Sequence, residues 1–164
     1  MAARIVGISF ADRPGEAAYI PLAHSGPDAP EQLPLGEVLA RLKAHAFRLV
    51  VATGKDTDRA TLILDHLGLM PYFDMVIGSD RVPHPKPAPD MAHLALDRFR
   101  LTPREAIFVG DAVADLRCGA EAGTATAAAL WGEPDEAALR GQNPTCVLRH
   151  PRDLLTLLEI AADA

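Results

Sequence analysis

Residues 47–54 read Phe-Arg-Leu-Val-Val-Ala-Thr-Gly, and residues 106–115 read Ala-Ile-Phe-Val-Gly-Asp-Ala-Val-Ala-Asp. Each stretch begins as a short apolar run and ends in a polar turn, which is the pattern of a buried β-strand. After each stretch a helix is predicted, over 60–67 and over 113–122, and glycine ends both, at Gly68 and Gly123. A strand followed by a helix, twice over, favours an α/β fold.

The same alternation continues on either side of these stretches. Further strands are predicted at 75–78, at 124–130 and, at an edge, at 146–148. Further helices are predicted from Leu35 onward, over 89–99 and over 151–161, the last with Leu154, Leu157 and Leu158 facing inward. Strands that alternate with helices of this length form right-handed βαβ units. The sequence therefore predicts a three-layer, Rossmann-like α/β domain with a mainly parallel sheet.

The first 34 residues have a different pattern. Residues 5–11 and 17–23 are two strand-like runs, and the five residues between them contain Pro14-Gly15. A connection of this length and composition suits an antiparallel β-hairpin. Residues 24–34 contain three prolines and have the composition of a linker. We predict a hairpin and linker over 1–34, at or near the sheet edge, and an α/β core over 35–164, together forming one compact domain.

The composition limits the classes of protein to which the chain can belong. Its 164 residues suffice for one domain, and 49% of hydrophobic residues suffice for a core. It contains no run of 18 apolar residues and no signal-like leader, so we expect neither a membrane span nor export. The formal charge of -6 disfavours a nucleic-acid surface. Cys118 and Cys146 are expected to be reduced thiols of a cytoplasmic protein.

Four polar residues stand at the ends of predicted strands or just after them, namely Thr53, Lys86, Asp111 and Asp115. In parallel sheets covered by helices, ligands bind beyond the carboxyl ends of the strands. Two carboxylates four residues apart at a strand-to-helix turn suit Mg²⁺, and a hydroxyl with a lysine suits a phosphate group. Each residue also has an ordinary structural explanation, since aspartate commonly caps helices and threonine commonly follows strands in turns. What favours a binding site is that all four residues lie at the same end of consecutive predicted strands.

Three ordered motifs make residues 35–164 resemble the haloacid dehalogenase (HAD) superfamily, most closely its phosphoglycolate phosphatase-like members. They are residues 50–54 (VVATG), 84–90 (HPKPAPD) and 109–115 (VGDAVAD). The resemblance implies a HAD-type fold, here without a cap domain, and hydrolysis of a small phosphorylated metabolite with Mg²⁺ as cofactor. It implies that Thr53, Gly54 and Lys86 bind the phosphoryl group. It also implies that Asp111 ligates Mg²⁺ and that Asp115 supports the metal site or the lysine.

The family's first motif is missing from the chain. That motif is a strand ending in Asp-x-Asp-Gly-Thr, whose first aspartate is the nucleophile and whose second is the general acid/base, and this sequence does not contain it. Without the nucleophilic carboxylate, a covalent mechanism cannot proceed. Asp12, after the first predicted strand, is the nearest candidate for the catalytic position, and its ordinary explanation is the start of a hairpin turn. Asp56 and Asp58 have the positions of N-terminal charges on the helix that follows.

A second resemblance concerns the N-terminal segment. Residues 4–34 are similar to part of the 3′–5′ exonuclease domain of bacterial DNA polymerase I, without the stretches that carry its metal-binding carboxylates. This resemblance implies a structural fragment with no nuclease activity, so the chain resembles a hybrid in which a hairpin replaces the first motif and the cap. The first-motif strand normally lies in the middle of a HAD sheet, and an empty place there would expose backbone groups. We therefore predict that one hairpin strand takes that place.

The sequence raises three functional hypotheses. The third, a nucleic-acid-associated module suggested by the exonuclease-like hairpin, is disfavoured by the net charge of -6 and the lack of a stripe of aromatic and basic residues. The other two follow from the HAD-like motifs. The chain is a Mg²⁺-dependent HAD-type phosphatase that is impaired or inactive because the nucleophile motif is absent, or it is a non-catalytic chimeric or relic scaffold that retains a phosphate and Mg²⁺ pocket. The sequence alone supports either. The expected ligand is phosphate or a small phosphorylated metabolite, with no nucleic-acid or membrane partner, and an incompletely covered sheet edge would favour a homodimer.

Overall fold

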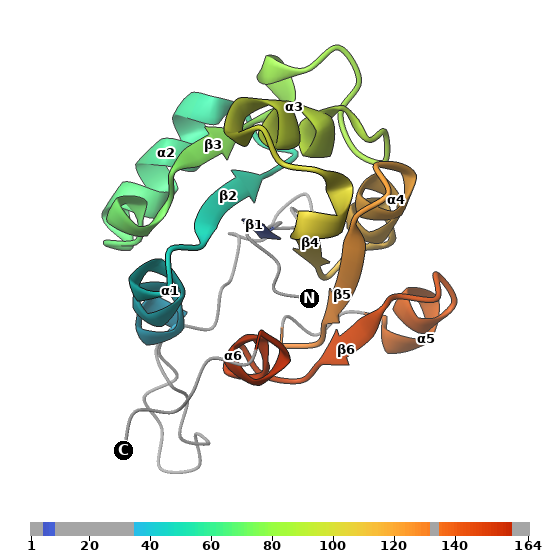
Figure 1. Cartoon of the computed structure of the whole chain (residues 1–164). Helices are drawn as coiled ribbons and strands as arrows, with labels where there is room; N and C mark the ends of the chain where they lie inside the picture. Colours follow the sequence, from blue (N-terminus) through green and yellow to red (C-terminus); the bar gives the residue numbers. More distant parts are fainter. Residues whose placement is uncertain (1–4, 9–34, 132–134, 159–164) are drawn as a thin grey trace.

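A computed structural model describes residues 5–8, 35–131 and 135–158. Its strands are Ile5–Ile8 (β1), Arg48–Ala52 (β2), Met75–Ile77 (β3), Ala106–Gly110 (β4), Ala125–Ala129 (β5) and Cys146–Leu148 (β6). They form a six-stranded sheet in the order β3-β2-β1-β4-β5-β6 (Figure 1), and every neighbouring pair is parallel. The predicted α/β fold class with a parallel sheet is confirmed.

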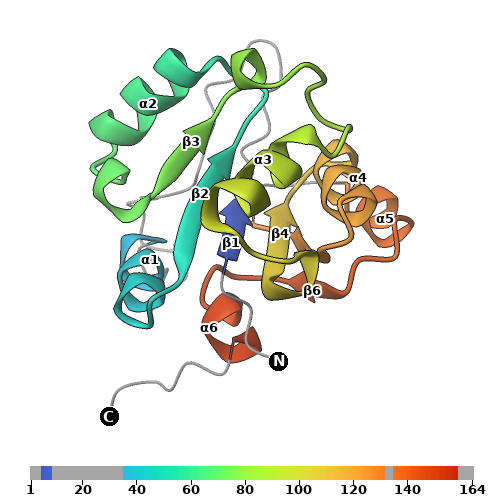
Figure 2. The same cartoon turned by 45° about the horizontal axis from the view of Figure 1, so that its top comes forward.

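Helices connect the strands and cover both faces of the sheet. They are Leu35–Ala44 (α1), Thr57–His66 (α2), Asp90–Phe99 (α3), Val113–Glu121 (α4), Glu136–Arg140 (α5) and Asp153–Leu157 (α6). Alternate residues of one strand point to opposite faces, so Leu49 and Val51 pack with α1 and α6, whereas Val50 and Ala52 pack with α3. Figure 2 shows α3 lying across the middle of the sheet.

The N-terminal strand lies in the centre of the sheet. Ile8 pairs with Val51 of β2 on one side and with Val109 of β4 on the other. The prediction that an N-terminal strand takes the central place is confirmed, and the prediction that this segment lies at or near the sheet edge is wrong for β1. The physical reason is that β2 and β4 both need a backbone partner at this position. The second predicted hairpin strand, residues 17–23, lies outside the described residues.

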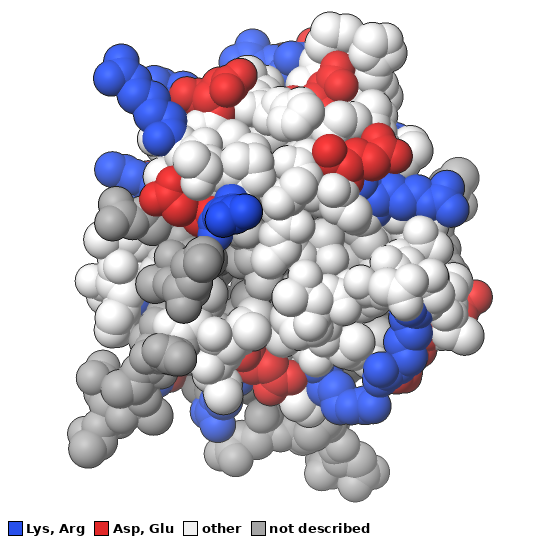
Figure 3. Space-filling model, turned by 45° about the vertical axis from the view of Figure 1, so that its right-hand side comes forward, with Lys and Arg blue, Asp and Glu red and all other residues white. Residues whose placement is uncertain are grey.

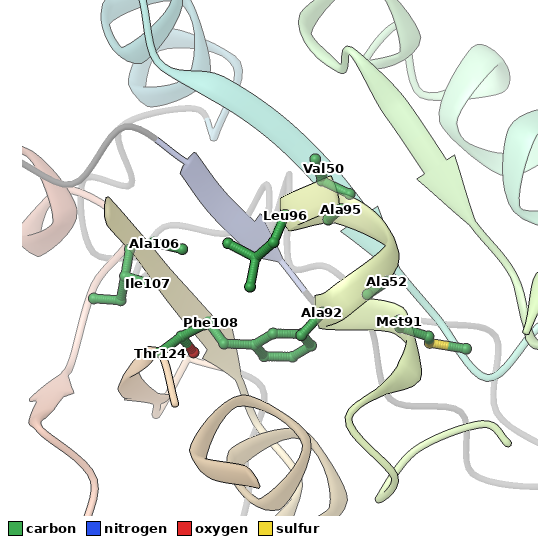
Figure 4. A pocket seen from close by; sticks show the side chains of 10 residues that line it. All are labelled: Val50, Ala52, Met91, Ala92, Ala95, Leu96, Ala106, Ile107, Phe108 and Thr124. Atoms are coloured by element: carbon green, nitrogen blue, oxygen red, sulfur yellow. The ribbon is translucent and has the colours of Figure 1, made fainter. Parts of the chain in front are cut away.

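A small apolar pocket lies between α3 and the middle of the sheet (Figure 4). From α3 it is lined by Met91, Ala92, Ala95 and Leu96, and from the strands beside β1 mainly by Val50, Ala52, Ala106 and Phe108. β1 lies between the two strands that line the pocket, since Gly7 pairs with both Val50 of β2 and Phe108 of β4.

The C-terminal third differs from the sequence-based expectation in two details. Leu154 is buried as predicted, but Leu157 is 38% exposed and Leu155 is buried in its place. Positions 154, 155 and 158 also share a helical face, and this face turns to the sheet. Helix α5 was not predicted, and Cys118 and Cys146 are free thiols as expected.

Among the described residues, no helix combines the length and apolar character that crossing a membrane requires.

The connection from α1 to β2 passes through a left-handed residue that is not glycine. Ala46 has φ 62°, between the end of α1 and the start of β2. The Ala46 N–H donates to the Lys43 carbonyl and the Phe47 N–H to the Leu42 carbonyl, so the turn closes the helix in the usual way. A side chain with a Cβ is strained in this conformation by about 1–2 kcal/mol.

We predict that Ala46→Gly raises the free energy of unfolding by about 0.5–1 kcal/mol, because the strain removed exceeds the extra flexibility of the unfolded chain. The matched control is Ala40→Gly, at an exposed position inside α1, which should lower it by about 1 kcal/mol. Chemical denaturation of the three proteins measures both changes. Equal destabilisation by the two substitutions would contradict the account of this turn.

Candidate active site

The loop after β2 carries Thr53 and Gly54 at the carboxyl edge of the sheet. Thr53 is 1% exposed, and its N–H donates to the Ile77 carbonyl at the end of β3 at 2.9 Å. Its Oγ1 accepts from the Lys55 N–H at 3.2 Å, which restricts the orientation of the side chain. Gly54 is exposed, and a Cβ at this position would meet no atom of the described residues within 4 Å.

Lys86 reaches the same edge from the segment between β3 and α3. Its side chain is 7% exposed. Its Nζ donates to the carbonyl of Ala52, the last residue of β2, at 3.0 Å and to Oδ1 of Asp115 in α4 at 2.7 Å. Since β1 lies between β2 and β4, the lysine joins the strand on one side of β1 to the helix that follows the strand on the other side.

Asp115 lies in the first turn of α4 and is 1% exposed. While its Oδ1 accepts from Lys86, its Oδ2 accepts from the Ala112 N–H at 3.1 Å. A charge pair as buried as this one needs both carboxylate oxygens to be hydrogen-bonded. Gly110 makes the arrangement possible, because a Cβ at that position would overlap the side chain of Asp115.

Asp111 follows β4 directly and is partly exposed, with Oδ1 buried. The structure thus brings the sequence-predicted residues to one edge in two groups. Lys86 and Asp115 are in direct contact, and Thr53 adjoins the carbonyl that binds Lys86. Asp111 lies between Gly110 and Ala112, which pack against Asp115 and hydrogen-bond to it.

Asp111 carries an oxygen ligand of the kind that Mg²⁺ prefers, directly after the end of β4. Both oxygens of Asp115 accept hydrogen bonds, one from Lys86 and the other from the Ala112 N–H. Across residues 5–8, 35–131 and 135–158, no group of three His, Cys, Asp or Glu side chains could hold a metal by itself. Mg²⁺ commonly takes one or two carboxylates and completes its shell with waters and phosphate oxygens. The residues therefore fit an ion that is held jointly with a bound phosphate.

Asp12, the candidate for the catalytic position, lies outside the described residues. The described strand ends at Ile8, level with Val51 and Val109. The chain's Asp-x-Asp, at residues 56–58, lies elsewhere, at the start of α2. There Asp56 Oδ1 accepts from the Arg59 N–H at 2.8 Å, so its predicted position at the helix N-terminus is confirmed.

Two charged residues at this edge were missed in the sequence analysis. Lys55 is 7% exposed, although it follows the open Gly54. Asp80, in the 3₁₀ turn after β3, accepts on Oδ1 from the N–H and the hydroxyl of Thr57 at 2.7 and 2.8 Å. Hydrogen bonds from Thr57 lower the pKa of Asp80 below its usual value, so it is ionised at neutral pH. The signal that could have found Asp80 is its position after a strand, which it shares with Asp111.

Comparisons with known proteins concern the family and the fold of the chain. Residues 33–123, more than half of the chain, match the sequence profile of haloacid dehalogenase-like hydrolases. The chain belongs to this family. It is 38% identical over 121 residues to a phosphoglycolate phosphatase of Aquifex aeolicus (strain VF5), a match that covers 74% of this chain and 55% of the relative. It is 38% identical over 119 residues to the pyrophosphatase PpaX of Bacillus velezensis, covering 73% and 55%.

Solved structures of HAD-like proteins have the same fold. A haloacid dehalogenase-like family hydrolase from Streptococcus pneumoniae superposes with a TM-score of 0.67 at 30% identity, over 74% of this chain and 56% of that one. A HAD-superfamily hydrolase from Geobacter sulfurreducens superposes with a TM-score of 0.64 at 30% identity, over 74% and 53%. The chain spans about half the length of the relatives that it matches.

We predict that Gly110→Ala lowers the free energy of unfolding by about 1–3 kcal/mol, because the new Cβ displaces the Asp115 carboxylate from Lys86 and Ala112. Gly36→Ala in α1 is the control, since among the described residues a Cβ there meets the Tyr72 side chain at 3.7 Å or more. That change should stabilise the protein by about 0.5–1 kcal/mol. Denaturation curves decide, and a Gly110→Ala variant as stable as the parent would refute the packing argument.

Proposed function

We propose that this domain is the phosphoryl-binding core of a HAD-type phosphatase, which recognises phosphate or a small phosphorylated metabolite. The observation that carries the proposal is the placement of the Lys86 ammonium. It is nearly buried, oriented by the Ala52 carbonyl and the Asp115 carboxylate, and lies at the strand edge that also carries Thr53. The phosphatase and pyrophosphatase names of the relatives support the same ligand chemistry.

In this proposal, the phosphoryl group is bound by neutral hydrogen-bond donors and by one positive charge. The Thr53 hydroxyl and the Gly54 backbone bind phosphoryl oxygens by hydrogen bonds, and Lys86 binds them by charge. Asp115 contacts no ligand and acts through Lys86, whose ammonium it holds in place. Preorientation matters because a buried cation that does not have to move loses little entropy when the phosphate arrives.

Asp111 would hold Mg²⁺, with phosphate oxygens and waters as the other ligands. When bound, the ion would neutralise charge on the phosphate and so favour attack at phosphorus. The residues of the chain itself bind and orient the phosphoryl group beside it. Because Asp111 supplies one protein carboxylate, we expect the affinity for the ion to be low when no phosphate is present.

We further propose that turnover is slow or absent. The Asp-x-Asp-Gly-Thr motif does not follow β1, and removal of the nucleophile from a covalent mechanism commonly costs about 10⁴-fold or more in rate. The alternative is that Asp12 takes the place of the nucleophile. If Asp12 does not take that place either, the chain has no nucleophile and is a non-catalytic scaffold that binds phosphate and Mg²⁺ at a retained pocket.

We propose that residues 1–34 are a separate fragment, similar to part of an exonuclease domain, joined to a HAD-like core at 35–164. One feature of the described residues supports a join that is not fully adapted, namely Ala46 in a left-handed conformation that glycine would adopt without strain. The central position of β1 supports a structural task for the fragment, because it pairs both neighbours.

The proposed ligand is small, and nucleic acid is not among the proposed partners. Figure 3 shows one face of the molecule, on which basic and acidic side chains are interspersed around a largely uncharged centre. With a net charge of -6, such a surface does not favour a polyanion. The free cysteines support a cytoplasmic location. Edge strands β3 and β6 are where a homodimer would pair.

Calorimetric titration with inorganic phosphate, in Mg²⁺ and in EDTA, tests the proposed pocket. We predict binding that EDTA weakens and that Thr53→Val weakens about 10-fold or more, because a hydrogen bond to a charged ligand is lost. Thr145→Val is the control, since the Thr145 Oγ1 also accepts a backbone N–H, from Thr126 at 3.1 Å, but between β5 and β6. A folded chain that binds no phosphate would contradict the proposal.

Hydrolysis of p-nitrophenyl phosphate by the same samples, with Asp12→Asn in parallel, separates the catalytic alternatives. No turnover by a chain that binds phosphate is the expected result. Metal-dependent turnover that Asp12→Asn abolishes would show instead that the N-terminal segment supplies a nucleophile.

A further inference from the structure

The loops after β2 and β3 are joined by backbone hydrogen bonds at the site. The Thr53 N–H donates to the Ile77 carbonyl, and the Ser79 N–H donates to the Lys55 carbonyl, both at 2.9 Å. Residues 53–55 are therefore held on both sides of Gly54, on one side by the last residue of β3 and on the other by the loop that follows it. The geometry that a phosphate would meet at Thr53 and Gly54 depends on where that second loop lies.

A side-chain contact completes this junction. Asp80 Oδ1 accepts from the Thr57 N–H at 2.7 Å and from the Thr57 hydroxyl at 2.8 Å. The same hydroxyl oxygen accepts from the Gly78 N–H at 3.2 Å. Bonds to an ionised acceptor are roughly twice as strong as bonds between neutral groups. Asp80 thus makes the charged link between the two loops.

The close approach of the loops depends on glycine at position 78. A Cβ on Gly78 would overlap the backbone of Asp56 and Thr57 and the carboxylate of Asp80. Capping of α2 does not account for the contact, since Asp56 already caps that helix through the Arg59 N–H at 2.8 Å. Asp80 instead fastens the first residue of α2 to a different loop.

We infer that Asp80 is a positioning residue for the phosphoryl pocket: through Thr57 and the backbone of residues 77–79 it holds Thr53, Gly54 and Lys55 in the geometry that binds phosphate. The inference rests on the proposed phosphate-binding role of Thr53 and Gly54. Asp80 itself touches no ligand in this account. Its loss should loosen residues 53–55 and weaken phosphate binding, with a smaller effect on the rest of the fold.

Asp74 provides a matched control at the opposite end of the same strand. It precedes β3, and its carboxylate accepts from the Lys43 Nζ at 2.7 Å, from the Arg48 guanidinium at 3.2 Å and from the Leu49 N–H at 2.9 Å. It therefore fastens β3 to α1 and β2 away from the site. Loss of Asp74 should cost stability without changing the loop that carries Thr53.

The test compares Asp80→Ala, Asp80→Asn and Asp74→Ala. Amide hydrogen exchange at residues 53–55, read by NMR without ligand, should accelerate about 10-fold or more in Asp80→Ala relative to Asp74→Ala. The dissociation constant for inorganic phosphate in Mg²⁺ should rise about 10-fold in Asp80→Ala and stay within twofold of the parent in Asp74→Ala. Asp80→Asn, which keeps an acceptor without the charge, should fall between the parent and Asp80→Ala in both measurements.

Equal exchange at residues 53–55 in Asp80→Ala and Asp74→Ala would overturn the inference, even if both variants are less stable than the parent. Unchanged phosphate affinity in an Asp80→Ala variant with accelerated exchange would also overturn it, because the loop would then not control binding. A parent chain that binds no phosphate would overturn the proposed function separately, and the positioning inference with its ligand role would fall with it.

Discussion

The buried ion pair between Lys86 and Asp115 crosses the central strand of the sheet. The two side chains are 7% and 2% exposed, so the pair is costly to desolvate. Two further hydrogen bonds offset this cost, because the Lys86 ammonium also donates to the Ala52 carbonyl and the second oxygen of Asp115 accepts from the Ala112 N–H. The position of the lysine depends on Asp115, and Asp115 depends on Gly110 for space. The proposed phosphoryl pocket would in turn depend on the lysine. Since β1 lies between β2 and β4, Lys86 connects the end of β2 with the helix that follows β4.

Much of the fold could be predicted because burial in a parallel sheet leaves a simple signature. Residues 49–52 of β2 and 106–110 of β4 are continuous apolar runs, and glycines with positive φ at 68 and 123 follow the helices. The central position of β1 was implied by the resemblance to the HAD family, whose first-motif strand lies in the middle of the sheet, together with the need of the neighbouring strands for a backbone partner. Periodicity could not predict which face of the five-residue helix α6 is buried, so Leu157 was wrongly placed inward. It could not predict α5 either, because five residues give too short a pattern.

The site was partly predictable for a different reason. Strand ends mark where ligands bind, so Thr53, Asp111 and the lysine of the third motif could be placed at one edge. Which side chains pair depends on their approach in three dimensions, which the sequence does not show. The sequence therefore left open whether Asp115 supports the metal site or the lysine. In the structure its two carboxylate oxygens contact Lys86 and the Ala112 N–H. Asp80 and Lys55 were not predicted as site residues, because an aspartate in a turn and a lysine in a loop have the sequence pattern of ordinary surface charges. The contacts of Asp80 and the burial of Lys55 are visible in the structure alone.

A double-mutant cycle on Lys86→Met and Asp115→Leu, measured by chemical denaturation, tests the central claim most directly. Each single change leaves a buried charge without its partner, and we predict a loss of about 3–5 kcal/mol in the free energy of unfolding. The double variant should lose far less than the sum of the two, because neither charge remains. Additive losses, within about 0.5 kcal/mol, would contradict the claim that this pair joins the two sides of the site.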